Sequence, residues 1–155
     1  MVVHAYYPLA ETRVQREAET LVRAGFDVDV ICLRDEGERP RDRWGGVAIH
    51  RLRARVDKRG LAAQLLSYLR FLVLATCRLT RLHLRRPYQT VQVHNLPDFL
   101  VFCAVVPKLQ GVPVILDLHD LMPEFFAGRF GPDRPVIAQI VRWQERLACR
   151  FADHV

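Results

Sequence analysis

The chain has 155 residues, carries 23 Lys and Arg against 17 Asp and Glu, and is 50% hydrophobic. That length fits one domain or one half of a two-domain protein, and the composition excludes an intrinsically disordered chain. Nearly all of the positive charge is arginine, because the only lysines are Lys58 and Lys108. The formal charge of +6 favours an anionic ligand or surface, since guanidinium groups fit phosphate and carboxylate.

Cysteine spacing and hydropathy predict a cytoplasmic chain. The four cysteines lie far apart, with no spacing typical of zinc sites or disulfide frameworks, so we expect reduced side chains. The first residues lack the basic segment and long apolar run of a signal peptide. The longest stretch without a charged residue or histidine, Gly60 to Leu69, has about half the length of a membrane-spanning helix. The sequence therefore predicts a soluble protein that at most sits on a membrane surface.

Strand and helix signals alternate from the N-terminus. The apolar run Val2–Tyr7 predicts a strand, and apolar residues at helical spacing over Val14–Val22 predict a helix that stops at Gly25. Thr12 and Gln15 have the spacing of a capping box at the start of this helix.

Two further strands are expected on either side of a polar loop. Val28–Leu33 is typical of a buried strand, Arg34–Gly46 of a loop, and Val47–Leu52 of another strand. Charge then falls on alternate residues, a usual way to protect a sheet edge. These residues are Arg51, Arg53 and Arg55.

The second half of the chain continues the alternation. A long helix, a strand, a helix, a strand and a final helix are expected, and Ala152–Val155 approaches one more strand. The expected bounds are Leu61–Arg85, Val91–Val93, Pro97–Leu109, Pro113–Leu118 and Val136–Phe151.

Strands that alternate with helices predict a parallel sheet covered on both faces. We therefore expect one α/β domain over residues 1–155, with a Rossmann-like doubly wound parallel sheet. In such sheets ligands bind outside the carboxyl ends of the strands, at the switch point. Polar side chains stand at three of these expected exits. They are Tyr6, Tyr7, His94, Asn95, Asp117, His119 and Asp120.

The first strand exit argues against nicotinamide and P-loop chemistry. A dinucleotide enzyme needs a glycine-rich turn there, so that backbone can approach the pyrophosphate. The segment Tyr7–Thr12 contains no glycine, and no P-loop motif occurs in the chain.

The densest polar cluster follows the last expected strand. Asp117, His119, Asp120 and Glu124 combine three carboxylates with an imidazole. An imidazole beside a carboxylate can exchange a proton near neutral pH or hold a sugar hydroxyl by a hydrogen bond. Alternatively, Asp120 or Glu124 caps a turn and His119 is structural. The strand-exit position favours the functional interpretation.

His94 and Asn95 follow the neighbouring strand. Both could line the same crevice, or Asn95 could serve the turn while Asp98 starts the next helix. The spacing of His94, His119 and Asp120 permits a metal ion but does not require one.

Two arginine groups suggest anion binding. Arg13 and Arg16 fall in the first turn of the first helix, where a phosphate could bind, or they pair with nearby glutamates. A basic stripe on the long helix, above a broad apolar body, would suit an anionic membrane, or it is the wet face of a core helix. The stripe consists of Arg70, Arg78, Arg81 and Arg85. No nucleic-acid recognition motif accompanies it.

Several motifs in combination resemble glycosyltransferase family 4 enzymes, and they cover essentially the whole chain. The matching segments are Val3–Pro8, Arg13–Ala18, Leu21–Val30, Val93–Asp98, Gly111–Asp120, Pro123–Glu124 and Ala152–Val155. The resemblance implies the N-terminal domain of a two-domain GT-B glycosyltransferase. This domain would hold the acceptor, and a C-terminal domain absent from this chain would bind the nucleotide-sugar.

The resemblance also implies roles for individual residues. His119 corresponds to a histidine beside the reacting sugar, and Asp120 to an acid on the acceptor side, so both are expected to be catalytic. His94, Asn95, Glu124 and Tyr7 are expected to bind the acceptor. Members of the family retain the anomeric configuration and need no bound metal or other cofactor.

One departure concerns the first loop, where many relatives place a glycine pair against the donor phosphates. This chain has none there, so Arg13 or Arg16 would compensate, or the other domain would hold the phosphates. The chain alone is expected to be inactive. The full-length protein is expected to transfer a sugar from a nucleotide-sugar to a cell-envelope glycan or lipid-linked acceptor. The alternatives are a nucleotide-sugar epimerase on the same scaffold and a non-enzymatic module that binds anionic lipid or a partner.

Overall fold

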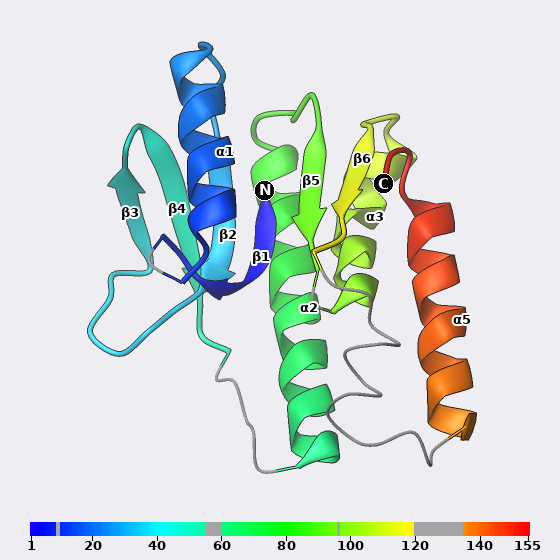
Figure 1. Ribbon diagram of the computed structural model, residues 1–155. Coiled ribbons are helices and arrows are strands. Elements are labelled where there is room, and N and C mark those ends of the chain that lie inside the picture. Colours follow the sequence, from blue (N-terminus) through cyan, green and yellow to red (C-terminus); the bar gives the residue numbers. More distant parts are fainter. Residues whose placement is uncertain (9, 55–59, 96, 120–134) are drawn as a thin grey trace.

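The computed structural model describes residues 1–8, 10–54, 60–95, 97–119 and 135–155. The strands are β1 (Val2–Tyr6), β2 (Asp29–Leu33), β3 (Arg41–Trp44), β4 (Val47–Leu52), β5 (Val91–His94) and β6 (Val114–Asp117). They form one six-stranded sheet in the order β3-β4-β2-β1-β5-β6 (Figure 1). β3 runs antiparallel to β4, and the other neighbouring strands are parallel.

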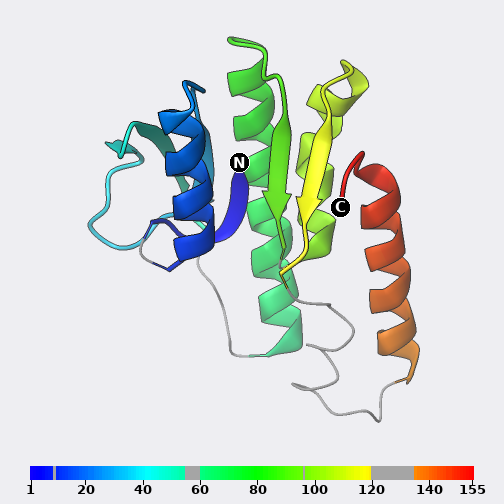
Figure 2. The same cartoon turned by 45° about the horizontal axis from the view of Figure 1, so that its top comes forward.

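The helices cover the two faces of this sheet. They are α1 (Thr12–Arg23), α2 (Leu61–His83), the 3-10 helix η1 (Asp98–Ala104), α3 (Val105–Leu109) and α5 (Pro135–Phe151). α1 lies on one face, and α2 lies on the other (Figures 1 and 2). The expected Rossmann-like α/β fold is confirmed. Strand order reverses between β1 and β5, which places the switch point there.

Each face has its own apolar core. Val14 and Ala18 of α1 are one turn apart and pack on β2 and β4. On the opposite face, Phe71, Ala75 and Leu79 recur every four residues along α2 and are buried in the larger cluster. Helical spacing thus brings apolar side chains to one side of each helix, and the parallel strands between them are apolar on both faces.

The expectation of a continuous loop over Arg34–Gly46 is wrong, because β3 lies within it. All residues of β3 are exposed, so the sequence lacks the apolar alternation that marks a strand. A two-residue turn sets the pairing instead: Gly45 and Gly46 have φ of +55° and +84° and join Trp44 to its register partner Val47. Glycine adopts these angles without strain, which suits a hairpin turn.

The expectation that the arginines after Val47 protect a sheet edge is also wrong. β3 occupies the edge, so β4 is internal and Arg51 is only 7% exposed. Its guanidinium lies 3.1 Å from a Glu38 carboxylate oxygen and 3.0 Å from one of Asp42. Arg51 therefore fixes the hairpin to the β2–β3 connection.

Two helix predictions need correction. α1 begins at Thr12 with Glu11 at the N-cap and no side-chain capping bond, so Thr12 and Gln15 form no capping box. The helix expected over Pro97–Leu109 is a 3-10 helix up to Ala104 and becomes α-helical only at Val105. Pro107 lies in the first turn of α3, where its missing N–H is tolerated.

α2 is more apolar than the charge-free stretch within it suggested. Its 22 residues Ala62–His83 include an 18-residue window with mean hydropathy of 1.2, so length and composition alone would let it span a bilayer. The count of consecutive uncharged residues missed this, since isolated arginines interrupt the run. One side of α2 nevertheless packs in the core of the domain, through Phe71, Ala75 and Leu79.

Candidate active site

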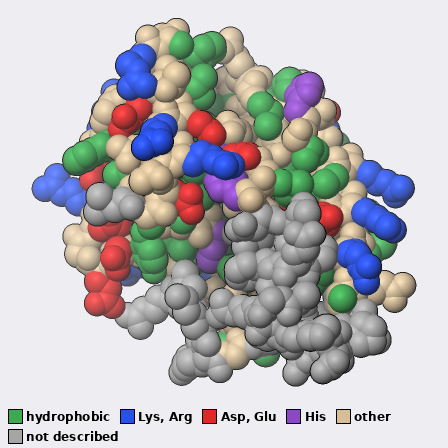
Figure 3. Space-filling model, in the orientation of Figure 1, with side chains coloured by type: hydrophobic (Ala, Val, Ile, Leu, Met, Phe, Trp, Pro, Cys, Tyr) green, Lys and Arg blue, Asp and Glu red, His purple; other side chains and the backbone are tan. Residues whose placement is uncertain are grey.

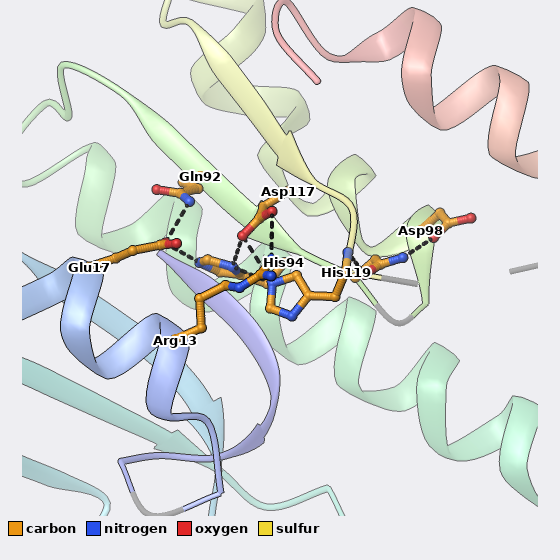
Figure 4. Close-up of polar contacts among 8 residues, drawn as sticks. Arg13, Glu17, Gln92, His94, Asp98, Asp117 and His119 are labelled. Carbon is orange, nitrogen blue, oxygen red and sulfur yellow. Dashed lines mark hydrogen bonds and ion pairs between the residues drawn. The ribbon is translucent and has the colours of Figure 1, made fainter. Parts of the chain in front are cut away.

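The ends of two neighbouring strands bring a carboxylate and two imidazoles together. His94 ends β5 and Asp117 ends β6, and the two residues are register partners. Asp117 Oδ2 lies 2.9 Å from His94 Nδ1 and 2.9 Å from His119 Nε2 (Figure 4). The two ring nitrogens are 3.3 Å apart. We call His94, Asp117 and His119 the His–Asp–His cluster.

The geometry of the cluster assigns the ring protons. One carboxylate oxygen faces both ring nitrogens, so His94 donates from Nδ1–H and His119 donates from Nε2–H. His119 Nδ1 then keeps its lone pair and makes no hydrogen bond to another described residue. His119 can therefore accept a proton or a hydrogen bond while Asp117 holds its ring in place.

The two histidines differ in exposure. The side chain of His94 is 0% exposed and that of His119 is 18% exposed. Burial lowers the pKa of His94 to about 4, although the Asp117 carboxylate acts in the opposite direction. His94 is therefore neutral near pH 7, and His119 is the ring of the pair that a ligand can reach.

A buried amide and carboxyl fix the backbone of His119. Asn95 Oδ1 accepts the His119 backbone N–H at 2.7 Å, and Asn95 Nδ2 donates to Asp98 Oδ1 at 3.0 Å. Asp98 is 0% exposed, and burial raises the pKa of its carboxyl to about 6. Asn95 thus joins the start of η1 to the segment after β6, as the alternative structural role for Asn95 and Asp98 predicted.

α1 contributes two charged groups from one face. Arg13 Nη1 lies 3.6 Å from Asp117 Oδ1, and Glu17, one turn later, accepts a hydrogen bond from Gln92 Nε2 at 3.0 Å. Glu17 Oε2 is also 4.0 Å from His94 Nε2, which has no hydrogen-bond partner among the described residues. The cluster therefore lies between α1 and the β5–β6 strand ends, where acidic, basic and histidine side chains gather (Figure 3).

This arrangement suits acid–base and hydrogen-bonding chemistry. A carboxylate that orients an imidazole fixes its tautomer and stabilises the imidazolium form. The same three ligand atoms lie within 4.8 Å of one another, so the cluster could also hold a metal ion. The expectation of a reaction without a metal remains a prediction.

The structure gathers some of the predicted site residues and not others. His94, Asn95, His119 and Arg13 meet at the strand ends, whereas Arg16 is exposed and makes no ion pair with another described residue. Tyr7 is 1% exposed and belongs to the apolar core beneath α1, where burial raises the pKa of its hydroxyl to about 12. Tyr7 therefore lines no open surface in this structure. Asp120 and Glu124 lie outside the described residues.

Two members of the site were given no role from the sequence, although Asp117 already stood in the polar cluster at a strand exit. Asp117 stands out as the carboxylate that bridges both imidazoles, and the sequence signal was its position opposite His94 at adjacent strand exits. Glu17 was considered only as a partner for arginine. Its four-residue spacing from Arg13 puts both on one helix face, but their contact with β5 and β6 depends on how α1 crosses the sheet.

Comparison with known proteins supports a family assignment. The family model of the glycosyl transferase 4-like domain matches residues 10–155, nearly the whole chain. No curated protein sequence matches the chain. The match includes α1, both histidine-bearing strand ends and α5, and it confirms the resemblance noted in the sequence. The chain belongs to the glycosyl transferase 4-like domain family and is a glycosyltransferase-type domain.

Proposed function

We propose that the domain forms the acceptor side of a retaining glycosyltransferase. Its full-length protein would move a sugar from a nucleotide-sugar to a cell-envelope glycan or lipid-linked acceptor, with the donor held by a second domain. The observation that carries this proposal is the His–Asp–His cluster, which lies at the carboxyl ends of β5 and β6, beside the switch point, and in which His119 is the exposed imidazole. An oriented imidazole at that edge is suited to a reacting sugar.

Each member of the His–Asp–His cluster would have a separate role. His119 Nδ1 accepts a hydrogen bond from a hydroxyl of the transferred sugar, or the ring stabilises charge that develops at the reacting centre. Asp117 holds the ring and offsets that charge, and His94 supports Asp117 from the interior. Arg13 stands 3.6 Å from Asp117 and is 55% exposed, so it can also meet a donor phosphate.

Replacement of His119 with Ala in the full-length protein tests this function. Transfer turnover is expected to fall at least ~100-fold, as is typical when an acid–base group is removed. Far-UV circular dichroism should not change, because the ring is at the surface of the cluster. His154→Ala, which removes an exposed histidine at the far end of the chain, is the control and should keep full turnover. Near-wild-type turnover in the His119 variant would contradict the assignment.

We further propose that α2 rests on an anionic membrane. One side of this helix leaves large apolar side chains exposed: Leu66 by 69%, Val73 by 60% and Leu65 by 47%. The basic stripe lies beside them. Burial, together with the like charges of Arg41, Arg81 and Arg85, lowers the pKa of Arg78 below its usual value. An anionic surface would relieve that repulsion while it covers the apolar side chains.

Flotation with vesicles that contain anionic phospholipid tests the membrane contact. The variant Arg78→Gln/Arg81→Gln/Arg85→Gln should bind about 100-fold more weakly, since each arginine near such a surface contributes roughly 1 kcal/mol. The control, Arg16→Gln/Arg43→Gln/Arg150→Gln, loses the same charge from other exposed positions and should float like the wild type. Equal loss in both variants would show that net charge, and not the α2 face, attracts the vesicles.

A further inference from the structure

A pocket opens at the carboxyl ends of β2 and β4, at the same end of the sheet as the His–Asp–His cluster. It has a volume of about 450 Å³, within the range of small-molecule sites. Three arginines line it, together with Asp35, Glu36, Gly37 and Ala54. The arginines are Arg34, Arg53 and Arg70.

Pairing between β2 and β4 holds Arg34 and Arg53 next to each other. Leu33 and Leu52 are register partners, and Arg34 and Arg53 follow them directly. The Arg34 backbone N–H donates to the Leu52 carbonyl at 2.9 Å, and its Nε–H donates to the Glu38 carbonyl at 2.8 Å. The backbone and guanidinium of Arg34 are therefore both anchored beside Arg53.

Charge in the pocket is incompletely compensated. Arg53 and Arg70 are exposed, and neither makes an ion pair or hydrogen bond with another described residue. Two carboxylates, those of Asp35 and Glu36, line the same pocket, so three guanidinium groups against two carboxylates leave one positive charge in excess. Three guanidinium groups around one cavity suit a phosphate or carboxylate, which they can bind through paired hydrogen bonds.

The pocket is placed to hold a remote part of the acceptor. The strand order separates the β2–β4 exits from the β5–β6 exits by about three inter-strand spacings, roughly 15 Å. An extended acceptor could lie along this edge, with its receiving hydroxyl at His119. We infer that this pocket, the arginine pocket, binds an anionic group of the acceptor, a phosphate or a carboxylate, at a distance from the reacting sugar. This inference rests on the proposed function for the identity of the ligand as acceptor.

Binding of glucose 6-phosphate and of glucose to the full-length protein tests the inference without transfer activity. Glucose 6-phosphate should bind measurably by calorimetry, and glucose should bind at least tenfold more weakly. Arg53→Gln/Arg70→Gln should weaken glucose 6-phosphate binding at least tenfold, whereas Arg43→Gln/Arg150→Gln should change it less than twofold. Both substituted pairs are exposed, so neither substitution should disturb the fold, which circular dichroism checks.

One further arm separates the two sources of the anion, a lipid phosphate and a soluble anion. Vesicles that contain phosphatidic acid, added as competitor, should displace glucose 6-phosphate if a lipid phosphate reaches the pocket and leave it bound if only soluble anions do; either result keeps the arginine pocket. Equal binding of glucose and glucose 6-phosphate, or an unchanged affinity in Arg53→Gln/Arg70→Gln, would overturn it. If His119→Ala left turnover unchanged, the proposed function would be refuted, but the binding result for the arginine pocket would still stand.

Discussion

Replacement of the buried Asp98 with Asn should stabilise the protein at neutral pH. Asp98 has a carboxyl that is 0% exposed, and burial raises its pKa from 3.8 to about 6. Between these two pH values the folded protein retains a proton that the unfolded chain has released. Stability from this group is therefore complete below pH 3.8 and is lost as the pH rises through 6. The difference corresponds to roughly 3 kcal/mol, because tenfold in proton affinity is ~1.4 kcal/mol.

An Asn at this position avoids the ionisation while its carbonyl can still accept the Asn95 amide hydrogen bond. Urea unfolding followed by circular dichroism should show the variant more stable than the wild type by about 1–3 kcal/mol at pH 7.5. At pH 3 the difference should largely vanish, since Asp98 is then mostly protonated in both the folded and the unfolded state. Because the variant and the wild type are compared at the same pH, the contributions of other titrating groups to stability cancel. A variant that is less stable at pH 7.5, or a difference that does not change with pH, would refute the reasoning.

Two other substitutions test the fold and the interior of the site. Gly46→Ala should lower stability by more than ~2 kcal/mol, because φ is +84° and the new Cβ would lie 2.6 Å from Val22 Cγ1. Gly37→Ala has φ of +82° and open space around it, so urea unfolding should show only the smaller backbone cost; equal losses would contradict the clash. His94→Gln should flatten the fall in stability between pH 6.5 and pH 4 by up to about 3 kcal/mol, since burial lowers the pKa of His94 to about 4 and the unfolded chain takes up the proton first. An unchanged pH profile would show that His94 is not buried in its neutral form.

The sequence predicted the parallel core of the fold well. β2 is apolar throughout apart from Asp29 at its start, and α1 places Val14 and Ala18 one turn apart, so periodicity alone located these elements. β3 could not be found in this way. Its four residues are all exposed, and only the Gly45–Gly46 pair between it and β4 signalled a hairpin.

The candidate site was predicted in part for a similar reason. Strand-exit reasoning brought His94 and His119 to one edge, because residues at the carboxyl ends of adjacent parallel strands become neighbours. It could not show that His94 is buried while His119 is exposed, or that Asp117 bridges both. Those features depend on side-chain direction at the strand ends and on the position of α1. Tyr7 illustrates the limit, since it follows β1 but packs beneath α1 in the core.

Kinetic coupling between Asp117 and His119 tests most directly whether the His–Asp–His cluster works as one catalytic unit. The measurement is kcat for sugar transfer by the full-length protein in the variants Asp117→Asn, His119→Gln and the double substitution. If Asp117 acts through the ring that it orients, the double variant should be no more than a few-fold slower than the slower single variant. Independent effects that multiply in the double variant, or a fully active Asp117→Asn, would contradict the account.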